Sequence, residues 1–113
     1  DHMWDLTRYA LEFFNTYLPF SEMQSIDELI SNKDGYCFAK EGEVYAVYLR
    51  EGGTADLDLG DKKETYSVRW YNPREGGNLV KGTVSTVKGP GKVNIGRAKK
   101  DVYKDWAVLI KKM

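Results

Sequence analysis

Carboxylates are the residues of this chain that could perform catalysis or bind a metal. Asp56 and Asp58 stand two residues apart, and such a pair could bind Ca²⁺ with help from loop oxygens, or could simply form the solvent face of a strand. Four glutamates lie in or beside predicted turns, and a hydrolytic acid and base would require one of them to be buried with a raised pKa: Glu41, Glu43, Glu51 and Glu64. Nothing in their surroundings predicts burial. We therefore expect no catalytic site and no metal site.

Nucleophiles give no stronger signal. Cys37 is the only cysteine, so an internal disulfide and a cysteine metal cluster are excluded, and it stands in an alternating stretch typical of a strand. The only histidine is His2, within Asp1–Met3, which we interpret as the remnant of an expression tag. No phosphate-binding glycine loop and no zinc-ligand spacing is present. We expect no cofactor.

Aromatic and arginine side chains indicate binding more clearly than catalysis. Arg69, Tyr71, Asn72 and Arg74 cluster around the end of one predicted strand, and we take them as candidate ligand or interdomain contacts. An exposed Tyr71 ring could stack on a sugar while arginine and asparagine bind its hydroxyls. Alternatively, Tyr71 packs beneath a loop. The same arginines could instead hold a neighbouring domain, because guanidinium groups pair bidentately with carboxylates.

The strand that must position this cluster spans residues 64–71. Tyr66, Val68 and Trp70 alternate with smaller or polar neighbours, which predicts a half-buried strand with one apolar face. Asn72-Pro73 and the glycine pair at 76–77 then predict a turn.

Short strands at intervals of roughly ten residues dominate the rest of the chain. They predict a mainly β fold, an antiparallel β-sandwich of seven or eight short strands preceded by one N-terminal amphipathic helix. Residues 44–50 are apolar on both faces, which predicts a central strand. The predicted strands span residues 36–39, 44–50, 54–59, 64–71, 79–80, 82–87, 93–95 and 106–110.

The N-terminal part has helical periodicity from Asp5 until Pro19 ends the pattern. Further on, Ser25 and Glu28 have the spacing of a capping box for a short helical turn. We divide the chain into a tag remnant (1–3), a helix and connector (4–35) and a β-sandwich (36–113). The apolar stripe of the helix would be costly to leave in water, so a partner surface must cover it: Leu6, Tyr9, Phe13, Phe14 and Tyr17.

Composition limits the partners. The 113 residues suit one domain, and 17 basic residues balance 17 acidic ones. This balance gives no net attraction to polyanions, and no apolar run approaches the ~20 residues of a membrane-spanning helix. We expect no nucleic-acid partner and no membrane partner.

Three segments together resemble a known family: residues 36–49, 66–74 and 105–110. The family is the "putative collagen-binding domain" of a putative collagenase, a C-terminal β-sandwich that follows an apiosidase-like (β/α)8 glycoside hydrolase barrel in secreted or periplasmic bacterial proteins. Residues 8–20 resemble the end of that barrel and its connector.

The resemblance implies a non-catalytic accessory domain that packs on the barrel and stabilises it, with the apolar helix facing the barrel. The alternative is an independent binding module for polysaccharide or a collagen-like matrix. Without the barrel, we expect the helix to pack on the sandwich or to pair with a second copy as a dimer. The resemblance also implies a secreted or periplasmic location.

Overall fold

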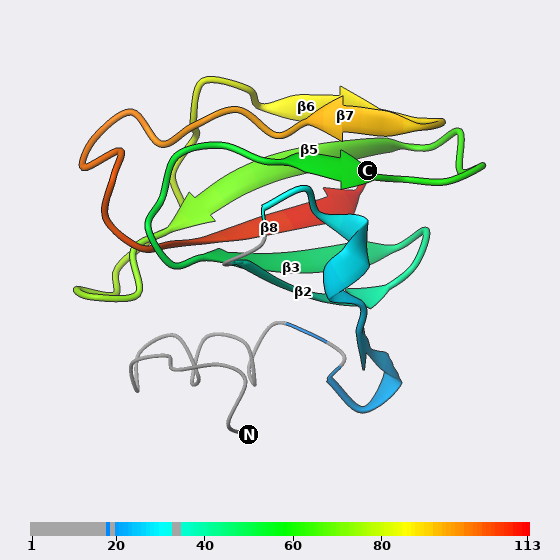
Figure 1. The fold of residues 1–113 in the computed structure, drawn as a ribbon, viewed down its shortest axis with the longest axis horizontal. Coiled ribbons are helices and arrows are strands. Elements are labelled where there is room, and N and C mark those ends of the chain that lie inside the picture. Colours follow the sequence, from blue (N-terminus) through cyan, green and yellow to red (C-terminus); the bar gives the residue numbers. More distant parts are fainter. Residues whose placement is uncertain (1–17, 19, 33–34) are drawn as a thin grey trace.

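The computed structural model describes residues 18, 20–32 and 35–113. These residues form an antiparallel, mainly β fold with two 3₁₀ turns (Figure 1). None of the described helices is long and apolar enough to cross a membrane. The predicted amphipathic helix and its end at Pro19 lie outside the described residues. In chain order, the elements are η1 (Phe20–Glu22), β1 (Gln24–Ser25), η2 (Asp27–Leu29), β2 (Gly35–Lys40), β3 (Val44–Leu49), β4 (Asp56–Asp58), β5 (Thr65–Tyr71), β6 (Thr86–Lys88), β7 (Lys92–Asn94) and β8 (Trp106–Lys112).

The strands of the described residues form two sheets. The larger has six strands in the order β1-β2-β3-β8-β5-β6, and the smaller pairs β4 with β7. β8, the last strand in sequence, lies in the middle of the large sheet between β3 and β5 (Figure 1). The large sheet therefore depends on contacts between residues that are far apart in sequence.

β5 confirms the strand predicted over residues 64–71. Tyr66, Val68 and Trp70 are each 0% exposed and face the main core, as the alternation predicted. The strand pairs with β8 so that Val68 lies opposite Ile110. The prediction that β3 is a central strand covered on both sides is also confirmed, because all six of its residues are buried.

The main core lies between the large sheet and the β4–β7 pair. Leu57 of β4 is fully buried in the same apolar cluster as Tyr45 of β3 and Val68 of β5. Here, the inner face means the side of the large sheet that carries this cluster, and the outer face means the opposite side. A second cluster lies on the outer face and includes Leu18 and Met23, which precede β1.

Three local predictions were wrong. Ser25 belongs to β1, which the sequence pattern did not predict, and η2 begins after Ile26 without a side-chain cap. The Asp27 carboxylate instead accepts the Cys37 backbone N–H at 2.9 Å, so it joins this turn to β2. The capping-box spacing thus predicted the position of the helical turn correctly, but the capping hydrogen bond from Ser25 is absent.

The strand predicted over residues 82–87 begins later, at Thr86. Thr83 donates its backbone N–H to the Arg97 carbonyl at 2.8 Å, so this stretch bonds to another loop before it pairs with β5. Gly82 allows the close approach, since a Cβ there would collide with the Arg97 carbonyl and the Trp70 indole. The strand predicted at 79–80 is reduced to one bridge between Val80 and Trp70.

Candidate functional site

The four candidate contact residues lie in two different places. Arg69 and Tyr71 are two residues apart on β5 and both belong to the outer face, opposite the buried Trp70. Asn72 and Arg74 follow in the loop between β5 and β6. The four residues therefore form two separate groups, one on the outer face of β5 and one in the loop that follows it.

Tyr71 is buried on the outer face. It is 4% exposed and belongs to the second apolar cluster, so its ring offers no open surface for stacking on a sugar in this structure. Of the two predicted placements, an open ring and a ring packed beneath a loop, the open ring does not agree with this burial. The cluster consists of Leu18, Met23, Val44, Ala46, Tyr71, Ala107 and Leu109, with Phe38 packed against it.

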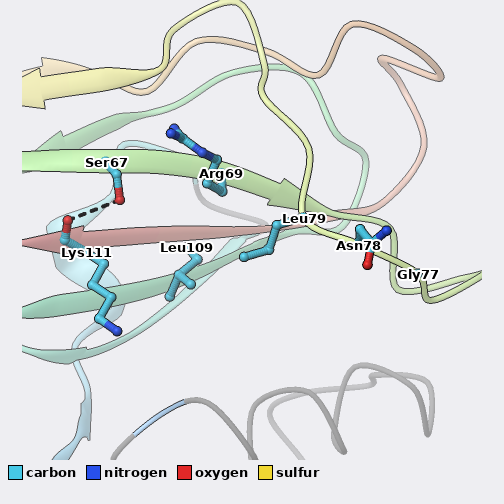
Figure 2. Close-up of a pocket in the computed structure, with 7 residues that line it drawn as sticks. All are labelled: Ser67, Arg69, Gly77, Asn78, Leu79, Leu109 and Lys111. Carbon is cyan, nitrogen blue, oxygen red and sulfur yellow. Dashed lines mark hydrogen bonds between the residues drawn. The ribbon is translucent and has the colours of Figure 1, made fainter.

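A cavity of about 420 Å³ lies beside this cluster, next to Arg69 (Figure 2). Leu79 and Leu109 give it an apolar wall, whereas the Arg69 guanidinium is held by the Val68 and Ser85 carbonyls at 2.8 and 2.9 Å. The described residues that line it are Ser67, Arg69, Gly77, Asn78, Leu79, Leu109 and Lys111. The arrangement suits an apolar partner surface with polar groups at its edge.

Arg74 ties the β5–β6 loop to the beginning of β8. Its guanidinium donates to the Asp105 carboxylate at 2.6 Å and to the Asp105 carbonyl, and it lies 5.4 Å from the centre of the Trp106 ring. The other Asp105 carboxylate oxygen accepts the Tyr48 hydroxyl at 2.9 Å. Arg74 is therefore committed to an internal contact, and the same tie holds Trp106 in place.

Asn72 shapes the same loop. Its side-chain oxygen accepts the backbone N–H groups of Arg74 and Glu75 at 2.9 and 3.3 Å, and its carbonyl accepts that of Gly76 at 2.9 Å. Asn72 also lines a second cavity, of about 520 Å³. Its lining is Asn72, Glu75, Gly76, Asn78, Val80, Lys81, Lys99, Lys100 and Trp106.

Sequence reasoning did not connect these lysines with Asn72. Lys81 lies in one loop and Lys99 and Lys100 in another, so only the tertiary fold brings them to one cavity. One sequence feature points to Lys99 and Lys100, though not to Lys81: basic residues are concentrated toward the end of the chain.

Comparison with known proteins agrees with this architecture. Residues 22–111 match the sequence profile of the family described as "Putative collagen-binding domain of a collagenase". The chain belongs to this family. The match confirms the resemblance inferred from residues 36–49, 66–74 and 105–110.

A solved structure of a protein named "Glycoside hydrolase" is similar to this chain, with a TM-score of 0.65 and 16% sequence identity. The similarity covers 91% of this chain and 24% of that one, so the chain spans about a quarter of its length. At this identity the likeness concerns the fold. No curated protein shows a significant match.

None of the six carboxylates considered as catalytic or metal-binding candidates is buried. Asp56 accepts the Asn94 side-chain amide at 2.9 Å, and Asp58 accepts the Gly60 backbone N–H at 2.8 Å. The four glutamates considered as a hydrolytic pair are all exposed: Glu41, Glu43, Glu51 and Glu64. A hydrolytic general acid requires a carboxyl in a buried setting, and none of the four has one. In the described part of the chain, no three potential metal ligands of the His, Cys, Asp or Glu type come together.

Cys37 is fully buried on the inner face of β2. Burial raises the pKa of its thiol from 9.0 to about 12, and the nearby Asp27, Glu41 and Glu28 contribute to the rise. A thiol that stays protonated at neutral pH is a poor nucleophile. Cys37 therefore acts as a small core residue.

Proposed function

We propose that this chain is a non-catalytic accessory domain of a bacterial glycoside hydrolase-like polypeptide, and that it packs on an upstream (β/α)8 barrel and stabilises it. The observation that carries this proposal is the outer face, which has a buried apolar cluster of its own and borders a cavity walled by the partly exposed Leu79. Family membership and the fold shared with a protein named "Glycoside hydrolase" support it. The domain would act through its shape and surface.

The segment that leads into β1 also supports docking through the outer face. Leu18 and Met23 are buried there, so the residues before β1 already run along that face. Next to them, Leu79 is 36% exposed at the cavity wall, and its apolar surface would gain from a partner. A barrel connected through this segment would meet the outer face with little intervening chain.

Finer features of the proposal concern the layers and the N-terminal part. The two sheets would act as the layers of a β-sandwich, which the shared core of β4 and the large sheet supports. The apolar stripe from Leu6 to Tyr17 would face the barrel, or would pack on the outer face or a second copy when the barrel is absent. Membership of a collagen-binding family supports a secreted location.

The test uses the polypeptide that contains both the barrel and this domain. Leu79→Asp places a charge in the proposed contact, and we expect it to lower the stability of the barrel by about 1–2 kcal/mol, as unpaired charges in apolar interfaces do. Val80→Asp is the matched control, because this neighbouring residue lines the other cavity. Barrel melting is followed by calorimetry. Unchanged barrel melting after deletion of residues 22–113 would refute the stabilising role.

A second candidate function is an independent binding module for polysaccharide or collagen-like matrix. The 520 Å³ cavity favours it, because it combines lysines, side-chain amides and an indole at one end of the sheet. The chain would be incubated with insoluble polysaccharides and with fibrillar collagen and then sedimented. Saturable retention that is lost in Val80→Asp and kept in Leu79→Asp would support a binding module. Retention on no material would argue against it.

A further inference from the structure

We propose that the 520 Å³ cavity where β5 ends and β8 begins binds an acidic glycan, a sugar chain that carries carboxylates. This inference rests on the binding-module form of the proposed function and not on docking to a barrel. The cavity lies between the β5–β6 loop and the loop before β8. Both loops lie at the end of the sheet where β5 ends and β8 begins, at the left of Figure 1. We call it the lysine cavity.

Charge is the first argument. Lys81, Lys99 and Lys100 line the cavity, and the only carboxylate in its described lining is that of Glu75. Among the described residues, none of these three lysines is within ion-pair distance of a carboxylate. The nearby Asp105 is occupied by Arg74 and Tyr48. The lysine cavity therefore keeps an excess of positive charge in a chain whose overall charge is zero.

Hydrogen bonding is the second argument. Because the Asn72 side-chain oxygen accepts two backbone N–H groups, the amide orientation is set and its NH₂ group remains as the donor. Asn78 adds a second amide to the lining, and Val80, which is 47% exposed, adds apolar surface, whereas Trp106 is only 5% exposed. Donors for carboxylate and hydroxyl oxygens thus stand beside the exposed Val80 side chain. The volume falls in the range of about 300–1,000 Å³ typical of small-molecule sites.

Rigidity is the third argument. Arg74 ties one wall of the lysine cavity to Asp105, and the Trp106 indole N–H donates to the Asp101 carbonyl at 2.9 Å in the other wall. The bridge between Trp70 and Val80 holds the far end of the β5–β6 loop, with backbone bonds of 2.7 and 2.8 Å. Both lysine-bearing loops are therefore fixed before a ligand arrives, which lowers the entropic cost of binding.

The experiment is an NMR titration of the chain with alginate oligosaccharides, in which every sugar carries a carboxylate. We expect the signals of Asn78, Lys81 and the Trp106 indole N–H to shift, and the double variant Lys99→Gln/Lys100→Gln to bind about tenfold more weakly. The matched control is Lys63→Gln/Lys88→Gln, which removes the same charge near the start of β5, about 20 Å away along the strand. It should bind within about twofold of the unmodified chain.

Several outcomes would overturn the assignment. Equal weakening in both double variants would show diffuse charge attraction rather than a site. Equal binding of neutral dextran would exclude recognition of carboxylates, and equal binding of duplex DNA would indicate a site for polyanions in general. No shifts at about 1 mM oligosaccharide would refute binding at useful affinity. Because the barrel test depends on Leu79 and the outer face, failure of either proposal can be recognised separately.

Discussion

The two faces of the large sheet pack their aromatic rings in different geometries. The inner face carries large rings in edge-to-face pairs, Tyr45 with Tyr66 at 5.7 Å and Trp70 with Trp106 at 6.1 Å between ring centres. The outer face instead carries a stacked pair, Tyr36 with Tyr48 at 6.3 Å between ring centres, together with an apolar cluster that mixes Tyr71 with small residues such as Ala46, and it borders a cavity. The inner face is completed by the chain's own β4–β7 pair, whereas the buried cluster of the outer face includes Leu18 and Met23, which precede β1.

The largest effect should come from truncation on the inner face. Trp70→Ala should lower the free energy of unfolding by about 3–5 kcal/mol, because Trp70 is fully buried and its neighbours cannot close the space. Leu109→Ala on the outer face should cost about 2 kcal/mol, since Leu109 already borders a cavity. Urea denaturation of both variants measures the difference. Equal losses would show that the outer face is as completely packed as the inner one.

The next effect concerns the tie between the loops. Arg74→Ala should cost about 1–3 kcal/mol, because it removes the charge-assisted bonds to Asp105 and leaves that carboxylate with fewer donors. Arg74→Lys should recover only part of the stability lost in Arg74→Ala, because a single ammonium cannot reproduce the contacts of the guanidinium. Urea denaturation measures both variants. A loss below about 0.5 kcal/mol in Arg74→Ala would mean that the loops are held by their backbone bonds alone.

A smaller, pH-dependent effect should arise from Cys37 on the inner face. The folded state holds its thiol pKa at about 12 against an ordinary value of 9.0, so the folded state keeps its proton where the unfolded chain loses it. Stability should therefore fall as the pH rises from about 9 toward 12, by at most about 1.4 kcal/mol per pH unit from this group. Below about pH 9 the thiol is protonated in both states, and the stabilisation that Cys37 provides is fully present.

Cys37→Ala provides the comparison for this pH dependence. The variant should show a shallower loss of stability over the same alkaline range, measured by urea denaturation at a series of pH values. Burial also raises the pKa of Tyr66, so part of the alkaline loss should remain. Identical slopes in the two proteins would mean that the thiol of Cys37 reaches solvent without unfolding.

The smallest effect should come from the exposed residue at the edge of the outer face. Leu79→Asp in this chain alone should change the free energy of unfolding by no more than about 0.5 kcal/mol, because Leu79 is 36% exposed. This near-neutrality makes it a suitable probe of partner docking. A loss above about 2 kcal/mol would show that Leu79 supports the fold itself.

Local alternation in the sequence predicted which side chains face the core. Tyr66, Val68 and Trp70 on β5, and the fully apolar β3, were assigned correctly because burial on one or both faces imposes a recognisable pattern. Tyr71 was harder to place. Its position in the alternation assigned it to the second face, and only the residues packed against that face decide whether a ring there is open or covered.

Contacts between distant segments could not be predicted in the same way. The meeting of Lys81 with Lys99 and Lys100, and the tie from Arg74 to Asp105, depend on which strands become neighbours. The sequence around residues 79–84 likewise gave no indication that the Thr83 backbone N–H donates to the Arg97 carbonyl before β6 begins. Periodicity describes one strand at a time, and the candidate site is built from loops between strands.

The central place of β8 has a consequence for how the domain comes into existence during synthesis. β3 and β5 are the neighbours of β8 and do not pair with each other, so a nascent chain that has emerged only through β7 lacks the strand that joins the two halves of the large sheet. Contacts of such long sequence separation form late and slowly. The domain should therefore remain open to chaperones and proteases until β8 has been made and can insert between β3 and β5.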